Sequence, residues 1–146
     1  MAVFNIRVYG ILINEKKDVL VTDEFRFGQQ MTKFPGGGLN WGEGTIDCLK
    51  REFREELGCE IEVIRHFYTT DFFQPSAFHT DHQLISIYYL VKNIGLIEKK
   101  ISRKKTELGK TEGAQTFRWI PVAQLISEEF TFPIDKKVVL MLSPVA

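Results

Sequence analysis

Apolar and polar residues alternate at the start of the chain, which is the pattern of a β-strand with one buried face. Phe4, Ile6 and Val8 are separated by polar residues, and the run then stays apolar to Ile13, so this strand becomes buried on both faces. β-Branched and aromatic residues predict four further strands, at Val19–Phe27, Glu60–Phe73, Gln83–Val91 and Gln115–Ile120. Because a short polar turn separates the first two strands, we expect them to pair as a hairpin.

Two segments have the spacing of amphipathic helices. Over Thr45–Leu57 the apolar residues recur at intervals of 3, 4 and 4, which places them on one stripe. This stripe consists of Ile46, Leu49, Phe53 and Leu57. Thr45 is the expected N-cap, and Gly58 is expected to end the helix. A second helix is predicted over Ile134–Leu142, with Pro133 in its first turn.

The segments between these elements predict two long loops. Residues 31–44 are rich in glycine, which lets a backbone adopt positive φ and lie close to another group. Residues 94–113 show no regular pattern and predict an exposed loop, with five basic side chains among the eight residues of Glu98–Lys105. Strands before and after a central helix predict a single α/β domain over residues 1–146, with one sheet covered by helices.

The charge balance narrows the class of protein. The 146 residues contain 19 Lys and Arg and 19 Asp and Glu, so the formal net charge is zero. This argues against a protein that coats DNA or an anionic membrane, whereas a small anionic ligand needs only a local site. No signal peptide or membrane-length apolar run is present, and Cys48 and Cys59 are too few for a disulfide framework. We therefore expect a cytoplasmic protein with reduced thiols.

The predicted helix over Thr45–Leu57 carries three carboxylates on one face. At about 100° per residue, Glu52, Glu55 and Glu56 fall within one arc beside the apolar stripe. Glu52 and Glu56 form an i,i+4 pair of like charges, which an isolated helix resists unless a cation neutralises it. Hard divalent cations such as Mg²⁺ prefer oxygen ligands of this kind. Arg51 lies four residues from both Asp47 and Glu55, so it can hold a carboxylate from the side.

An acidic helical face is more often a solvated surface than a metal site. Here no lysines stand at the helical spacing that would pair them with these glutamates. In addition, a glycine-rich loop leads directly into this face of the helix. A backbone that can approach a phosphate, next to an acidic face that can hold a metal, is suited to phosphoryl chemistry.

The segment Gly37–Cys59 resembles the Nudix box. Seven glycine or charged positions match at fixed offsets over 23 residues. They are Gly37, Glu43, Arg51, Glu52, Glu55, Glu56 and Gly58. This resemblance implies an α/β/α sandwich with a central mixed β-sheet flanked by helices. It also implies hydrolysis of a nucleoside diphosphate linked to another moiety.

The resemblance also implies roles for individual residues. The side chains of Glu52, Glu55 and Glu56 and the carbonyl of Gly36 resemble the ligands of Mg²⁺ or Mn²⁺. Arg51 resembles the residue that orients the carboxylates, and Glu43 one that steadies the junction of loop and helix. Glu52 is the candidate general base within the box. In several branches of the family the base is a glutamate from a loop outside it, for which Glu107 and Glu112 are the candidates here.

Recognition of the substrate lies outside the box. Arg26, Phe27 and Phe73 are candidate substrate contacts, because arginine pairs with phosphate and aromatic rings stack on bases. Glu43, Pro75 and Glu112 are further candidate substrate contacts. Pro75 stands near the offset of a proline that resembles a marker of ADP-ribose hydrolysis, and a plain turn explains it equally well. The basic run in Glu98–Lys105 suits a solvated loop or contact with an anionic nucleotide or RNA.

Two other functions remain open at this point. One is a non-catalytic Nudix-like module that binds a nucleotide, although such modules usually lack part of the box. The other is an isomerase of a diphosphate-bearing substrate, for which Cys48 is poorly placed as the added catalytic cysteine. Nucleoside triphosphates, ADP-ribose, dinucleoside polyphosphates and nucleotide sugars all remain candidate substrates. Members of the family are often dimers, so the resemblance is also compatible with a homodimer.

Overall fold

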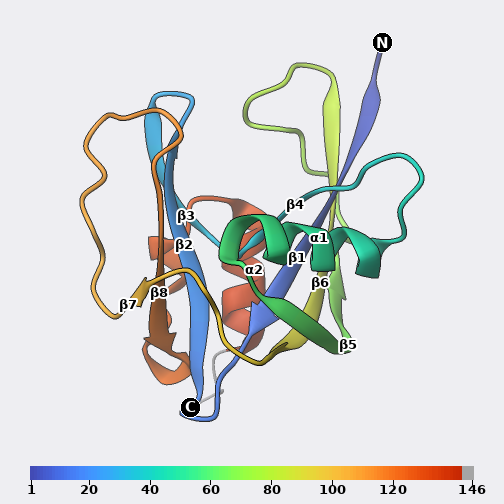
Figure 1. Ribbon diagram of the computed structural model, residues 1–146. Coiled ribbons are helices and arrows are strands. Elements are labelled where there is room, and N and C mark those ends of the chain that lie inside the picture. The colour runs from blue at the N-terminus through green and yellow to red at the C-terminus, as the bar shows by residue number, and fades with distance from the viewer. Residues whose placement is uncertain (143–146) are drawn as a thin grey trace. The chain divides into compact units, whose positions relative to one another are not determined.

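The computed structural model describes residues 1–142, in which the chain divides into two units, each with its own four-stranded sheet (Figure 1). Unit 1 comprises Met1–Leu12 and Pro35–Lys99, and unit 2 comprises Ile13–Phe34 and the chain from Lys100 onward. The predicted α/β class is confirmed, since each unit combines a mixed sheet with an α-helix. The strands form two sheets where the sequence predicted one.

Unit 1 is built around a strand that is paired along both edges. Its elements are β1 (Val3–Leu12), β4 (Gly36–Gly38), α1 (Thr45–Leu57), β5 (Glu60–Thr69) and β6 (His82–Ile94). The strand order is β4-β1-β6-β5, with β1 parallel to β6 and the other pairs antiparallel. The triple glycine predicted as a loop is therefore the edge strand of this sheet. The strand predicted over Glu60–Phe73, the third along the chain, ends at Thr69.

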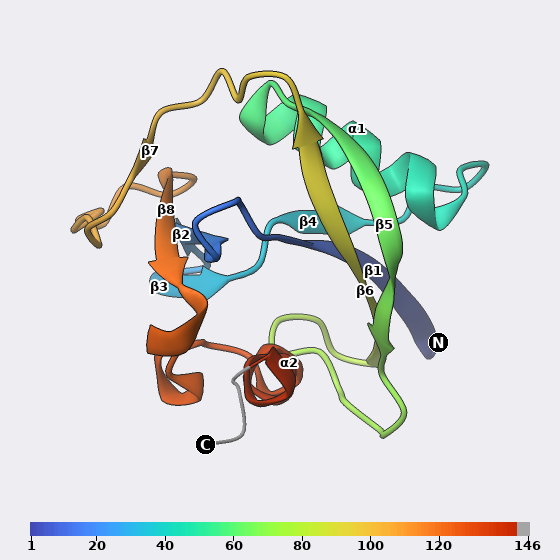
Figure 2. The same ribbon diagram turned by 90° about the horizontal axis from the view of Figure 1, so that it is seen from below.

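Helix α1 lies against one face of this sheet (Figure 2). A Cβ added at Gly10 of β1 would lie 2.6 Å from the Phe53 ring, so the missing side chain makes room for the helix. The helix has the predicted bounds, but Gly44 rather than Thr45 is the N-cap. The Thr45 hydroxyl is instead hydrogen-bonded to the Tyr89 hydroxyl at 2.6 Å. Ile46 is exposed, and Cys48 takes its place on the buried stripe.

The predicted hairpin between the first two strands is wrong. β1 is paired on both edges within its own sheet, so it has no free edge for a further strand. β2 (Asp18–Arg26) is likewise paired on both edges, with β3 (Gln29–Lys33) and β8 (Gln115–Pro121).

Unit 2 holds the remaining elements. Besides β2, β3 and β8 these are β7 (Ile101–Ser102), the 3₁₀ turns η1 (Val122–Gln124) and η2 (Ser127–Glu129), and α2 (Pro133–Leu142). The strand order is β3-β2-β8-β7, with β7 parallel to β8. The loop predicted over residues 94–113 is therefore interrupted by a short strand, whereas the closing helix matches its prediction. No helix within residues 1–142 is both long and apolar enough to cross a membrane.

A buried ion pair links the strands of unit 2. The Asp23 side chain is fully buried and accepts hydrogen bonds from Arg118 Nε at 2.7 Å and from Thr32 Oγ1 at 2.6 Å. These three residues lie on β2, β8 and β3, so one carboxylate joins three strands. Removing one partner of this buried pair would leave an uncompensated charge, so each partner is needed for the stability of unit 2.

Candidate active site

The carboxylates of α1 lie beside its buried stripe, as the helical spacing predicts. Leu49, Phe53 and Leu57 are buried on one side of the helix. Glu52 is mostly enclosed, with 13% of its side chain exposed, whereas Glu55 is 58% exposed. Gly58 ends the helix in the left-handed conformation (φ 59°), and its N–H donates to the helix carbonyls.

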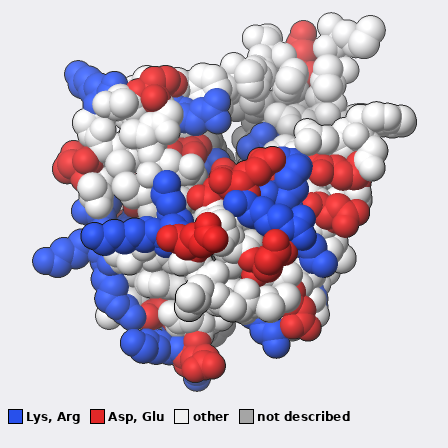
Figure 3. All heavy atoms as spheres, in the orientation of Figure 1, with Lys and Arg blue, Asp and Glu red and all other residues white. Residues whose placement is uncertain are grey.

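Arg51 joins these carboxylates to the loop and the strand before the helix. Its Nε and Nη2 donate to the two oxygens of Glu43, at 3.0 and 2.7 Å. Its Nη1 donates to Glu52 at 3.0 Å and to Glu55 at 3.2 Å, and Nη2 also donates to the Gly38 carbonyl at 3.1 Å. Over α1, acidic and basic side chains are accordingly interleaved (Figure 3). One guanidinium thus serves three carboxylates, so the cluster keeps a net negative charge.

The edge strand β4 leaves space for this cluster because it consists of glycine. A Cβ at Gly37 would overlap the Glu52 carboxylate, so this carboxylate lies directly against the backbone of the strand. Gly36 has φ 152°, and a Cβ there would overlap the Val8 carbonyl. Glycine is therefore required at both positions. At Gly37 a side chain would overlap Glu52, and at Gly36 a side chain would overlap the backbone and also be strained by the positive φ.

The register of β4 places the Gly36 carbonyl on the outer edge of the sheet. Gly37 pairs with Val8, and the Gly10 N–H donates to the Pro35 carbonyl. Since neighbouring residues of an antiparallel strand alternate in the direction of their backbone groups, the Gly36 and Gly38 carbonyls point away from β1. The Gly38 carbonyl accepts from Arg51, which agrees with this assignment.

Glu43 is the most strongly held carboxylate of the cluster. The hydrogen bonds from Arg51 lower its pKa from 4.5 to about 2, and the Asn40 N–H, which donates to Glu43 at 2.9 Å, adds to this effect. In turn, Glu43 raises the pKa of the Arg51 guanidinium. Both groups therefore remain charged over the whole physiological range. This agrees with the predicted role of Glu43 at the junction of loop and helix.

The donor set suits a hard divalent cation, but the cluster is arranged around arginine. Glu52 and Glu55 offer carboxylate oxygens and Gly36 a backbone carbonyl, the ligand types that Mg²⁺ and Mn²⁺ prefer. Arg54 does not neutralise them, because it pairs with Glu60 at 2.6 Å. Within residues 1–142, however, no three His, Cys, Asp or Glu side chains are grouped to hold a metal ion. The Arg51 guanidinium lies between Glu52 and Glu55, so a cation that bound both would have to share them with it.

Three of the predicted substrate contacts lie together in unit 2. Phe27 and Gly28 form the turn of the β2–β3 hairpin with φ of 52° and 76°, which is a rare conformation for phenylalanine. The Glu112 carboxylate accepts hydrogen bonds from both N–H groups, and the Arg26 guanidinium lies 5.3 Å from the centre of the Phe27 ring. Glu112 is thus bound to a turn, which is a role the sequence did not predict.

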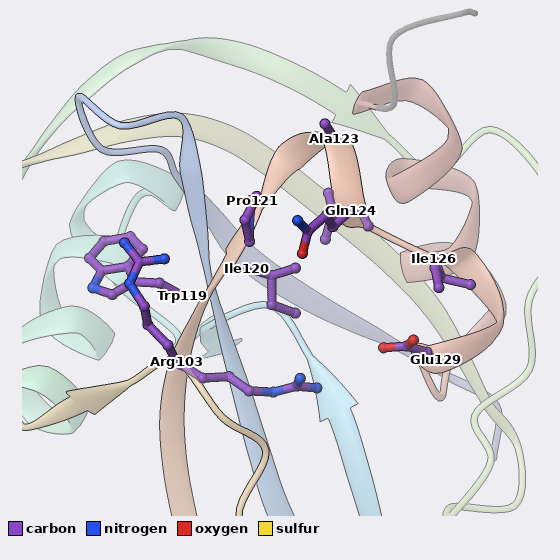
Figure 4. A pocket seen from close by; sticks show the side chains of 10 residues that line it. Arg103, Trp119, Ile120, Pro121, Ala123, Gln124, Ile126 and Glu129 are labelled. Atoms are coloured by element: carbon purple, nitrogen blue, oxygen red, sulfur yellow. The ribbon is translucent and has the colours of Figure 1, made fainter.

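The other predicted contacts lie in unit 1, in the loop between β5 and β6. Phe73 is exposed, and Pro75 forms an isolated bridge with Gln83. The predicted residues thus belong to three sets of elements: α1 and β4 in unit 1, the β2–β3 turn in unit 2, and this loop in unit 1. A further hollow in unit 2 is lined by the end of β8 and the two 3₁₀ turns (Figure 4), and none of the predicted residues lines it.

Cys48 belongs to the cluster although sequence reasoning assigned it no role there. Its thiol donates to the Gly38 carbonyl at 3.4 Å, and Arg51 Nη2 lies 3.7 Å from the sulfur. Burial raises the pKa of this thiol to about 12, so it stays protonated at neutral pH and cannot serve as a nucleophile. Its position three residues before Arg51 on the helix is the only sequence signal for this contact.

Comparison with known proteins identifies related chains. A family model, the NUDIX domain, matches residues 3–142. The chain is 28% identical to an RNA pyrophosphohydrolase of Ruthia magnifica, over 93% of this chain and 80% of that protein. It is 32% identical to Nudix hydrolase 2 of Arabidopsis thaliana, over 83% of this chain and 40% of that longer protein. The crystal structure of the MutT protein from Methanosarcina mazei Go1 has the same fold, with a TM-score of 0.69, 18% identity and coverage of 97% and 94% of the two chains.

The low pKa of Glu43 predicts a specific loss of stability in acid. Its pKa lies below the unfolded value, so the Arg51–Glu43 contact contributes stability above about pH 4.5 and loses it as the pH falls toward 2. We expect Glu43→Gln to remove part of this acid dependence, measured as the urea midpoint at a series of pH values. Glu15→Gln, in an exposed turn, should leave the profile unchanged. Parallel profiles for wild type and Glu43→Gln would show that the contact does not stabilise the fold.

Proposed function

We propose that this chain, which belongs to the Nudix family of pyrophosphohydrolases, hydrolyses the diphosphate linkage of a nucleoside diphosphate joined to another moiety. The observation that carries the proposal is the carboxylate cluster of α1, held by Arg51 against a glycine edge strand. The family acts on nucleotide substrates and generally uses divalent metals.

The metal would be held by four groups on two adjacent elements. These are the side chains of Glu52, Glu55 and Glu56 on α1 and the carbonyl of Gly36 on β4. When bound, Mg²⁺ or Mn²⁺ supplies charge neutralisation for the diphosphate and lowers the pKa of a coordinated water. The net negative charge of the cluster favours such a cation. The glycines of β4 support the proposal because they leave no side chain between the strand and Glu52.

The chain's own residues supply orientation and proton transfer. Arg51 holds Glu52 and Glu55 through a single nitrogen, which restricts the rotamers of both carboxylates. Glu43 fixes the other side of the guanidinium with two hydrogen bonds. We assign Glu52 the role of general base, which takes the proton of the attacking water at a carboxylate oxygen.

The two glutamates outside the box are weaker candidates for the base. Glu112 already accepts hydrogen bonds from the Phe27 and Gly28 N–H groups, so its use would break the β2–β3 turn contact. Glu107 lies exposed in the loop after β7. The enclosed position of Glu52 beside Arg51 therefore supports the base within the box.

Several relatives of this chain carry the name RNA pyrophosphohydrolase. Together with the predicted contacts of Arg26, Phe27, Phe73 and Pro75, this name supports a substrate that contains a nucleotide. We include the 5′ polyphosphate end of RNA among the candidate substrates, beside nucleoside triphosphates, ADP-ribose and nucleotide sugars. The cytoplasmic location and the homodimer stay predictions.

The direct test is an assay of the purified chain on a panel of these substrates with Mg²⁺ or Mn²⁺. We expect release of a nucleoside monophosphate, pyrophosphate or phosphate, identified by mass spectrometry in ¹⁸O-labelled water. A chelator should abolish turnover, and added Mg²⁺ should restore it, because the carboxylates alone cannot neutralise the diphosphate. Tight nucleotide binding without any turnover would contradict the proposal and favour a non-catalytic binding module.

Substitution of single carboxylates tests the assigned roles. We expect Glu52→Gln, Glu55→Gln and Glu56→Gln each to lower kcat by about 100-fold or more, because each removes a charged oxygen that serves the metal or the proton. The urea midpoint should change little for Glu55→Gln, whose side chain is exposed. Asp47→Asn, on the first turn of the same helix, is the matched control and should keep full activity. Near wild-type turnover of any of the three glutamine variants would remove that residue from the site.

A further inference from the structure

The loop between β4 and α1, which projects from unit 1, exposes a tryptophan (Figures 1 and 2). Trp41 lies in this loop, and its side chain is fully exposed. Tryptophan has the largest apolar surface of the side chains, so a position in the core would stabilise the fold far more than this one does. The indole at this position therefore adds nothing to the core and is open to a ligand.

The backbone around Trp41 forms a tight turn. The Glu43 N–H donates to the Asn40 carbonyl at 3.2 Å, and Gly42 has φ 91°. These are the features of a type II turn with Trp41 and Gly42 at its two central positions. The Asn40 N–H donates to the Glu43 carboxylate at 2.9 Å, which closes the turn a second time. Because the turn already holds the indole in place, a ligand that binds it loses little affinity to ordering of the backbone.

The same turn is bonded directly to the carboxylate cluster of α1. Glu43, two residues after Trp41, accepts two hydrogen bonds from Arg51. Arg51 in turn donates to Glu52 and Glu55. Two residues span at most about 7 Å of backbone, so Trp41 stands beside the guanidinium that orients the carboxylates. All of these residues belong to unit 1, and a ligand bound at the cluster therefore has a flat aromatic ring within reach.

We propose that the Trp41 indole stacks on the base of the nucleotide whose phosphates occupy the site on α1. This inference rests on the proposed function and adds a residue that contributes affinity for the base. Stacking needs only a free ring face, and because every base has one, it does not select among bases. Trp41 therefore strengthens the binding of nucleotides as a class, whereas the choice of one base over another requires polar groups.

The surroundings of Trp41 favour a small flat ligand over a protein partner. Stable protein interfaces bury about 1,200 Å² or more in total around an apolar centre. The other residues of the turn are polar or glycine, and the nearby cluster keeps a net negative charge. Ile46 is the next exposed large apolar residue along the chain. Two such side chains are fewer than an interface centre requires, whereas one indole matches one base in size.

The fluorescence of Trp41 tests the stacking directly. The chain contains two tryptophans, so Trp119→Phe leaves Trp41 as the single reporter. The ligands are inorganic tripolyphosphate and an ATP analogue with methylene bridges in place of both anhydride oxygens, each added with Mg²⁺. We expect the analogue to quench the Trp41 emission, because its adenine stacks on the indole. Tripolyphosphate has no base and should leave the emission unchanged.

Variants of Trp41 measure what the contact contributes. We expect Trp41→Ala to raise KM for a nucleotide substrate about tenfold or more with kcat nearly unchanged, because stacking holds substrate and transition state alike. Trp41→Phe retains a ring and should retain most of the affinity. Tripolyphosphate binding and the urea midpoint should not change in either variant, since the indole is fully exposed. Ile64→Ala is the matched control, because it shortens another exposed apolar side chain, on β5 at the opposite edge of the sheet from β4.

Several results would overturn the base contact. One is an unchanged KM in Trp41→Ala with turnover intact, which leaves the proposed hydrolysis standing. Others are no quenching by the analogue, equal weakening of tripolyphosphate binding, or an equal rise of KM in Ile64→Ala. A dimer that Trp41→Ala dissociates while KM stays unchanged shows that a second copy of the chain covers the indole. Quenching of Trp41 by the analogue without turnover of any substrate contradicts the proposed hydrolysis and supports the base contact.

Discussion

The contacts of the Arg51 guanidinium determine where the acidic face of this protein lies. The helix places Glu52 and Glu55 close together, and without a counter-charge their repulsion would drive the side chains apart. Arg51 binds both of them and also binds Glu43 in the preceding loop and the Gly38 carbonyl on β4. Because lysine cannot make this fork of contacts, the planar guanidinium is the group that the geometry requires. Helix, loop and strand are thereby joined at one point.

Arg51 can act in this way only because β4 is made of glycine. Gly37 leaves room for the Glu52 carboxylate on the helix face of the sheet, and Gly36 adopts a backbone conformation that other residues resist. Both requirements arise from close approach of backbone to a functional group. The Gly36 carbonyl on the outer edge of the sheet and the Glu52 carboxylate on its helix face therefore belong to neighbouring positions, as two ligands of one cation must. The same closeness makes the cluster sensitive to any side chain added to the strand.

The sequence predicted helix α1 and its carboxylate face because local signals agree there. The apolar spacing, the acidic first turn and Gly58 all indicate the same element. Local signals failed for the N-cap, because the Thr45 hydroxyl binds Tyr89, which is remote in sequence. They also failed for strand pairing. β4 has poor strand propensity and exists because β1 offers it an edge, and that partnership is visible only in three dimensions. Arg51 was expected between Asp47 and Glu55, yet Glu43 and Gly38 take the place of Asp47 because the loop brings them to the same side.

The proposed function requires that the cluster gathered by Arg51 holds a divalent cation together with the Gly36 carbonyl. The most direct measurement is a crystal structure of the chain soaked with Mn²⁺ and a non-hydrolysable nucleotide, with the ion located by its anomalous scattering. We expect manganese bound by the carboxylates of α1 and by the Gly36 carbonyl, with Arg51 still hydrogen-bonded to Glu43. Manganese bound at a different place, with Glu52 and Glu55 still held only by Arg51, would contradict it.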